Sequence, residues 1–161
     1  MTVPGRRLIQ LAYVGTALFT VVSVVEVVLM SWTRPIAVAV DLILFGIGCT
    51  MFLVSYAIAI SRSRTEEIGV ASLYFFTNRV APKSVQVRLL GAFAVQCVVA
   101  ITVASVRPFT TAAFSVLVPM FGLGINGLWA ARHGTFGPRV SDRPHTDTQS
   151  SEEMEQNAGH G

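Results

Sequence analysis

Four long runs of apolar residues, each with very few charges, account for most of the chain. They cover about residues 8–31, 36–60, 87–106 and 109–131. A helix needs about 20 apolar residues to cross a hydrocarbon core of about 30 Å. Each run is long enough, so the pattern predicts an all-α, polytopic membrane protein in which four transmembrane helices form one bundle over residues 1–132.

Short turns join the first run to the second and the third to the fourth. They contain Arg34-Pro35 and Arg107-Pro108, and because short connections join antiparallel neighbours, we expect two antiparallel helical hairpins. Each Arg-Pro pair is followed by a Phe-Gly-x-Gly sequence, at Phe45 to Gly48 and at Phe121 to Gly124. A parallel internal repeat is one interpretation, and a shared requirement of membrane hairpins is the other.

Glycines in mid-membrane indicate close helix packing, because packing rather than the hydrophobic effect drives helix association in lipid. Gly46 and Gly48 in the second run, and Gly122 and Gly124 in the fourth, are the predicted contact positions. Small residues also repeat along the first run from Ala12. They predict either a seam inside the bundle or a face for a second copy of the chain.

Three further residues of the apolar runs carry local predictions. Pro119 stands inside the fourth run and predicts a kink near Ser115, whose carbonyl group its ring would crowd. Gln96 places an amide in the bilayer, where it should face another helix and form a hydrogen bond with it. Trp129 suits the headgroup level of the inner interface.

Residues 61–86 are too many for a tight helix connection. Ser63 or Thr65 can cap a short helix with Glu66 and Glu67 in its first turn, where negative charge suits the helix dipole. Such a helix would lie in the inner membrane interface. The alternative is a plain loop that aromatic side chains anchor.

The composition changes after Arg132. Residues 133–161 are rich in Gly, Ser, Thr, Gln and Glu and contain almost no large apolar residue, so they cannot offset the entropy lost on ordering. We expect a disordered tail whose acidic segment, residues 150–155, is solvated. Tails of this kind can also bind partners.

The charged residues set the environment and the orientation. The chain has 161 residues, of which 52% are hydrophobic and 13% charged, against about 25% charged in a soluble domain. Of the twelve Lys and Arg, only Arg34 and Arg107 fall in the two short turns. The positive-inside rule therefore places both termini and the 61–86 loop in the cytoplasm, with the bundle in the plasma membrane. The basic residues are spread along membrane edges, so nucleic acid is not an expected partner.

Glu26 and Asp41 are the acidic residues within the predicted membrane spans. Each lies about 8 Å inside the outer edge at 1.5 Å per residue, at similar depths on adjacent helices. Arg34 and Arg107, in the two outer turns, are the candidate counter-charges, so we predict an intramembrane charge network of these four residues. An ion at this depth costs less than the roughly 3 kcal/mol of the bilayer centre.

The chain lacks the sequence patterns of catalytic or metal sites. Cys49 and Cys97 are far apart with no CxxC partner, and the three histidines show no ligand spacing. No phosphate-binding loop and no Ser-His-Asp arrangement can be built. We expect no enzymatic activity, no metal and no cofactor.

Three functions fit these patterns, all of them within a lipid bilayer. The first is a structural or accessory subunit of a plasma-membrane complex, in which Glu26 and Asp41 pair with Arg107 and Arg34 and lock the hairpins. The second is a small transporter that uses the two acids as a proton or cation site. The third is assembly through the tail and the small-residue faces with another membrane protein or a second copy.

The second hairpin resembles a known group of sequences. The matching stretches run from Arg107 to Thr110, from Val118 to Gly124 and from Trp129 to Phe136, after an Ala81-Pro82 entry into the third helix. They are similar to small uncharacterised four-helix membrane proteins of actinobacteria. The resemblance implies a plasma-membrane location and brings with it no activity and no catalytic residue.

Overall fold

The computed structural model describes residues 5–29, 34–106 and 111–138. Helices dominate this part of the chain, and the strands are only two residues long. The elements are α1 (Arg6–Leu29), α2 (Arg34–Arg62), β1 (Glu66–Glu67), α3 (Val70–Phe75), η1 (Thr77–Arg79), α4 (Lys83–Val106), η2 (Thr111–Leu117), α5 (Pro119–His133) and β2 (Gly137–Pro138), where η denotes a 3-10 helix.

Within the described residues, four helical segments are long and apolar enough to cross a membrane. This confirms the predicted all-helical class and is compatible with a multi-pass membrane protein. The four segments are α1, α2, α4 and the continuous segment from Ala113 to His133. The helices extend beyond the apolar runs at several ends, and α2 continues as far as Arg62. Arginine and lysine are compatible with such ends because their aliphatic stems cover apolar surface while the charged heads reach water.

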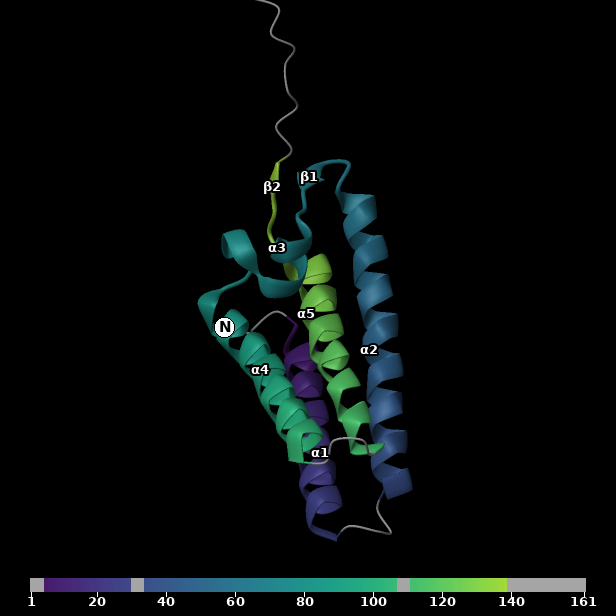
Figure 1. Cartoon of the computed structure of the whole chain (residues 1–161). Helices are drawn as coiled ribbons and strands as arrows, with labels where there is room; N and C mark the ends of the chain where they lie inside the picture. The colour runs from purple at the N-terminus through teal and green to yellow at the C-terminus, as the bar shows by residue number, and fades with distance from the viewer. Residues whose placement is uncertain (1–4, 30–33, 107–110, 139–161) are drawn as a thin grey trace, which may run out of the picture.

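The spanning segments run alternately up and down in one bundle (Figure 1). The most extensive contact in the bundle is between α2 and α5, and α1 lies alongside α4. The closest neighbours therefore join the first half of the chain to the second half. Neither half is packed mainly on itself.

α5 is the most enclosed helix, with contacts to α1, α2, α3 and α4. Every residue from Phe121 to Ala131 except Leu123 is buried. Trp129 is 0% exposed, forms a T-shaped contact with the Phe76 ring and stacks on His133. Its level in the membrane stays a prediction, but the ring is covered by the protein and does not face headgroups.

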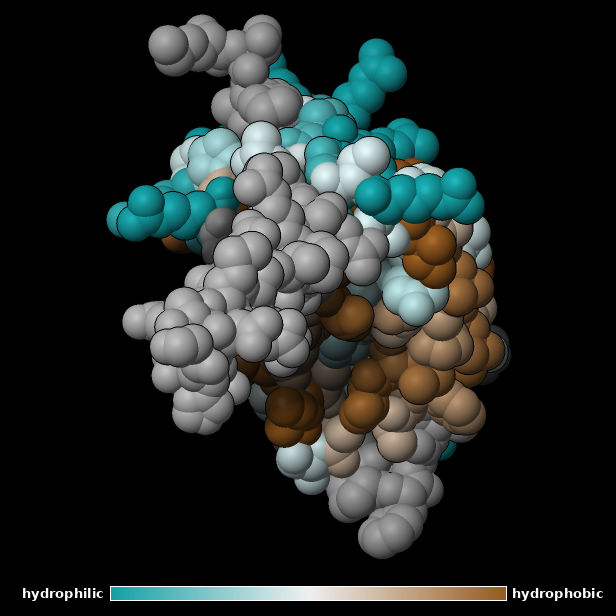
Figure 2. Space-filling view, turned by 90° about the horizontal axis from the view of Figure 1, so that it is seen from above, coloured by the Kyte–Doolittle hydropathy of each residue, from teal (hydrophilic) through white to brown (hydrophobic). Residues whose placement is uncertain are grey.

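The segment between α2 and α4 forms a cap, which we define as residues 63–82. The expected helix beginning at Glu66 and Glu67 is wrong, because these residues form β1 and pair antiparallel with β2. Glu66 lies opposite Pro138, and Glu67 lies opposite Gly137. The short helix of the cap begins only at Val70. Seen from above, hydrophilic residues gather over the cap, and hydrophobic residues cover the side of the bundle (Figure 2).

The start of the predicted tail is ordered, contrary to the expectation of disorder from residue 133. The Gly134 amide donates to the Ala130 carbonyl at 2.8 Å, and the Thr135 amide donates to the Val80 carbonyl at 3.1 Å. Backbone hydrogen bonds, together with the packing of Phe136 against the core, hold these residues, so composition alone missed them. The remainder of the predicted tail, 139–161, lies outside the described residues.

Candidate functional site

Glu26 and Asp41 are both buried near the end of the bundle opposite the cap. Their exposed fractions are 5% and 3%, and the two carboxyl groups lie close enough to interact electrostatically. Glu26 stands about 5 Å from the end of α1, and Asp41 about 10 Å from the start of α2, at 1.5 Å per residue. Ser23, one turn from Glu26 on α1, is buried as well. The structure thus brings together the two acids that the sequence singled out.

The arginines of the predicted charge network lie elsewhere or outside the described residues. Arg34 is exposed at the start of α2, where it borders an open hollow with Pro35 and Leu42. Within residues 5–29, 34–106 and 111–138, Asp41 and Arg34 form no ion pair. Arg107 is not among the described residues, so its pairing with either acid stays a prediction.

Gln96 of α4 is fully buried and holds the start of α5. Its Oε1 accepts a hydrogen bond from the Gly122 amide at 3.1 Å, and its Nε2 donates to Thr16 Oγ1 at 2.7 Å. Thr16 in turn donates to the Ala12 carbonyl at 2.7 Å. Because the first amide groups of a helix have no partner within it, Gln96 serves as a capping group supplied by a different helix.

Pro119 explains why α5 needs this cap. Proline has no amide hydrogen and crowds the preceding turn, so a regular helix does not continue through it. The chain before it is the 3-10 helix η2, which ends as the Val118 amide donates to the Ser115 carbonyl at 3.1 Å. In place of the kinked helix expected near Ser115, this membrane span is therefore divided into two helices.

Gly48 and Gly124 form the closest contact between α2 and α5. A Cβ atom at Gly48 would lie 2.5 Å from the Phe121 nitrogen, and one at Gly124 would overlap the carbonyl oxygen of Gly48. Both obstacles are backbone atoms. The two helices therefore touch where only glycine permits it, as the sequence predicted for these two positions.

The other two predicted glycines differ from each other. A Cβ atom at Gly122 would lie 2.6 Å from Gln96 Oε1, so this glycine leaves room for the capping amide. Gly46 has no atom within 4 Å of the position of a Cβ, and it faces outward. The predicted packing role of Gly46 inside the bundle is wrong, because α2 turns its other side towards α5.

Tyr74 of the cap reaches into the bundle from α3. The sequence indicated aromatic anchors in this segment but not which helices they contact. Its hydroxyl donates to the Phe52 carbonyl and accepts from Ser55 Oγ, both at 3.2 Å, and its ring stacks on Phe52 with centroids 4.4 Å apart. Burial raises the pKa of the Tyr74 hydroxyl, which keeps it protonated and able to donate. Gly127 of α5 provides the space, since a Cβ there would overlap the Tyr74 ring.

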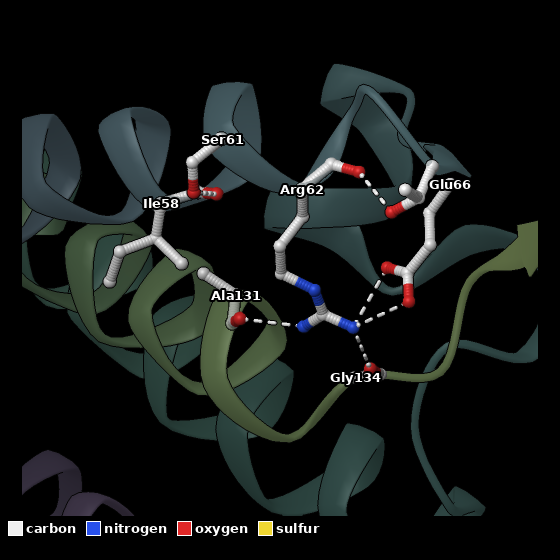
Figure 3. Close-up of polar contacts among 7 residues, drawn as sticks. Ile58, Ser61, Arg62, Glu66, Ala131 and Gly134 are labelled. Carbon is white, nitrogen blue, oxygen red and sulfur yellow. Dashed lines mark hydrogen bonds and ion pairs between the residues drawn. The ribbon is translucent and has the colours of Figure 1, made fainter.

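Arg62, at the end of α2, joins the cap and the residues after α5 (Figure 3). One guanidinium nitrogen donates to the Ala131 carbonyl at 2.8 Å. The other lies 2.8 Å and 3.0 Å from the two carboxylate oxygens of Glu66 and donates to the Gly134 carbonyl at 3.4 Å. The guanidinium carbon also lies 5.4 Å from the centre of the Phe136 ring. A cation at the carboxyl end of α5 also suits the dipole of that helix.

We call residues 134–138 the strap, because they cross the end of the bundle and are fastened at several points. The β1–β2 pairing, the Thr135 amide bond to Val80 and the contacts of Arg62 all hold the strap. A cavity of about 350 Å³ lies between the strap and the cap, with Glu67 and Ser72 among its lining residues. The sequence identified Arg62 only as a charge at a membrane edge, since its partners are distant in the chain.

Together these features define the class of protein. It is an all-helical chain with four segments able to cross a membrane, a tightly packed interior and a cap over one end. Among the residues that the structure describes, no cluster of three His, Cys, Asp or Glu side chains could hold a metal ion. Comparisons with protein-family models, curated protein sequences and solved structures give no match.

Proposed function

We propose that this chain is a structural or accessory subunit of a plasma-membrane complex and that it recruits a partner through its C-terminal segment. The observation that carries the proposal is the attachment of the strap to the end of the bundle. β2 pairs with β1, the Thr135 amide donates to the Val80 carbonyl at 3.1 Å, and Arg62 donates to the Gly134 carbonyl at 3.4 Å while it also binds Ala131 and Glu66. These contacts fix the position of the strap as far as Pro138. A fixed attachment at this point suits a C-terminal segment that presents itself to another protein.

The proposed orientation is two antiparallel hairpins with the cap end and both termini in the cytoplasm. Its support is the distribution of charge, because basic residues favour the cytoplasmic side. Among the described residues, the acidic side chains at the cap end are Glu66 and Glu67. The basic ones there are Arg6, Arg7, Arg62, Arg64, Arg79, Lys83, Arg88 and Arg132.

The interior supports a scaffold that keeps one shape. α2 and α5 meet through backbone contact at Gly48 and Gly124, and Gln96 fixes the start of α5. Packed interiors of this kind resist gradual deformation. Movement of one helix against another would break buried hydrogen bonds. This favours a structural subunit over a transporter that changes conformation.

Co-purification from native membranes in mild detergent tests the proposal. We expect removal of residues 140–161 to change the set of co-purifying proteins. Arg62→Gln should weaken recovery of the same partners several-fold, because it loosens the strap while leaving the rest of the C-terminal segment intact. Arg64→Gln, which removes an exposed charge two residues away, is the matched control and should behave as the unmodified chain. Identical sets from the full and shortened chains would rule out the C-terminal segment as the binding element.

A second candidate function is a small proton- or cation-coupled transporter, favoured by the burial of Glu26 and Asp41 beside each other. Intramembrane carboxylates of this kind mark ion pathways in many membrane proteins. If the chain is a carrier, liposomes that contain it should show proton- or cation-dependent flux that Glu26→Gln and Asp41→Asn each abolish. Glu67→Gln, at an exposed carboxylate of the cap, should leave the flux unchanged. Flux that survives both buried substitutions would end this interpretation.

A further inference from the structure

A groove lies between the cap end of α2 and the cap itself. Its volume is about 170 Å³, and most of its lining is apolar. The groove is formed by Tyr56 and Ile60 of α2 and by Ser63, Ile68, Val70 and Leu73 of the cap.

The groove continues the outward face of α2. Leu53, which precedes it on this helix, is 65% exposed, and Ile60 and Val70 at the groove are 54% and 63% exposed. In a membrane this face of α2 contacts lipid chains, since it belongs to a span that is apolar on its outer side. The groove is therefore an extension of a lipid-facing surface to the level at which α2 ends at Arg62.

Charge changes at the upper end of the groove. Ser63 is its last residue on the α2 side, and the exposed side chain of Arg64 follows directly. Arg62, Arg64, Arg79 and Lys83 all lie at this end of the bundle, and Figure 2 shows hydrophilic residues beside the hydrophobic ones in the view from above. An occupant that matches the groove is apolar along Ile60 and Val70 and anionic beside Arg64.

We propose that this groove binds an anionic phospholipid of the inner leaflet, with the start of an acyl chain against Ile60 and Val70 and the phosphate beside Arg64. A partner helix, with a diameter of about 10–12 Å, is too large for the groove, whereas part of one hydrocarbon chain fits. Basic pockets beside transmembrane helices on the cytoplasmic side attract anionic headgroups. The choice of leaflet rests on the orientation proposed above, and the binding does not depend on recruitment of a partner.

Native mass spectrometry of the full chain in detergent, supplied with phosphatidylglycerol or phosphatidylcholine, tests this inference. We expect retention of phosphatidylglycerol in preference to phosphatidylcholine. Arg64→Gln should weaken binding of phosphatidylglycerol about fivefold, the contribution of one basic side chain near an anionic lipid surface. Arg88→Gln, at an exposed arginine of α4 near the same end, is the matched control and should weaken it less.

A second variant tests the apolar part of the groove. Val70→Trp should fill the groove and displace both lipids. Because Val70 is exposed, the substitution should leave the melting temperature of the bundle unchanged. Val87→Trp, at a 73% exposed valine of α4, is the control and should leave retention unchanged. Equal retention of the two lipids by the unmodified chain, or undiminished retention of phosphatidylglycerol in both Arg64→Gln and Val70→Trp, would overturn the proposal. Neither result bears on partner recruitment by the C-terminal segment.

Discussion

Gly48→Ala is expected to lower the stability of the bundle by roughly 3 kcal/mol, near the upper end of the cost of overpacking a core. The added Cβ would lie 2.5 Å from the Phe121 nitrogen and 2.6 Å from the carbonyl carbon of Met120. These backbone atoms cannot rotate away, so α2 and α5 must separate. Alanine gains about 1 kcal/mol in helix propensity over glycine, which is too little to offset the clash. The thermal melting temperature in detergent measures the loss.

Gly46→Ala is the matched control, because Gly46 lies two residues earlier in the same helix with no atom within 4 Å of the added Cβ. Here the gain in helix propensity, about 1 kcal/mol, acts without opposition, and the melting temperature should stay the same or rise. The two substitutions are chemically identical and should have opposite effects. A fall of similar size in both would contradict the backbone contact between α2 and α5.

The different environments of Gly46 and Gly48 could not be predicted from the sequence. Both glycines lie in a helix whose lipid-facing side is as apolar as its buried side, so the periodicity that reveals the buried face of a helix in water is weak here. The apolar runs gave the number of spans and their approximate ends. They could not give the rotation of α2 about its own axis, on which the different environments of the two glycines depend.

Polar residues within the spans gave better information about rotation. Thr16, Glu26, Asp41 and Gln96 are all buried in the bundle, with exposed fractions from 0% to 8%. Polar groups face the inside of a membrane bundle because lipid offers them no hydrogen bonds. Charged and amide side chains could therefore identify the inward side of their helices, although not their partners. Threonine is a poorer guide, because the exposed Thr50 and Thr102 each bond a carbonyl of their own helix.

The contacts of the cap depend on residues that are far apart in the chain. Arg62 lies 69 and 72 residues from Ala131 and Gly134, whose carbonyl groups it binds. Glu66 and Glu67 suit the first turn of a helix locally, yet they pair with Gly137 and Pro138 as a strand. Local propensity is a weak guide where a distant segment supplies backbone hydrogen bonds. Pro119, by contrast, has a local effect, so the sequence located the disturbance before α5, although it predicted a kink where the structure has two helices.

Gln96→Leu is expected to destabilise the bundle by about 2 kcal/mol, within the range for leaving a buried amide unsatisfied. Leucine fills a similar space but cannot accept the hydrogen bond that the Gly122 amide donates to Gln96 Oε1. Thr102→Val on the same helix is the control. The exposed hydroxyl of Thr102 bonds only within α4, to the Val98 carbonyl at 2.7 Å, so its loss should cost little.

Thr16→Val separates the two hydrogen bonds of Gln96. It removes the acceptor of the amide nitrogen while the bond from the Gly122 amide to Oε1 remains, so we expect a smaller loss of about 1 kcal/mol. In the double variant, Thr16→Val should add little to Gln96→Leu, because residues in one network are not additive. Hydrogen exchange at the Gly122 amide should accelerate in Gln96→Leu and stay slow in Thr16→Val. Equal acceleration in both, with fully additive losses of stability, would mean that Gln96 fills space in the bundle without capping α5.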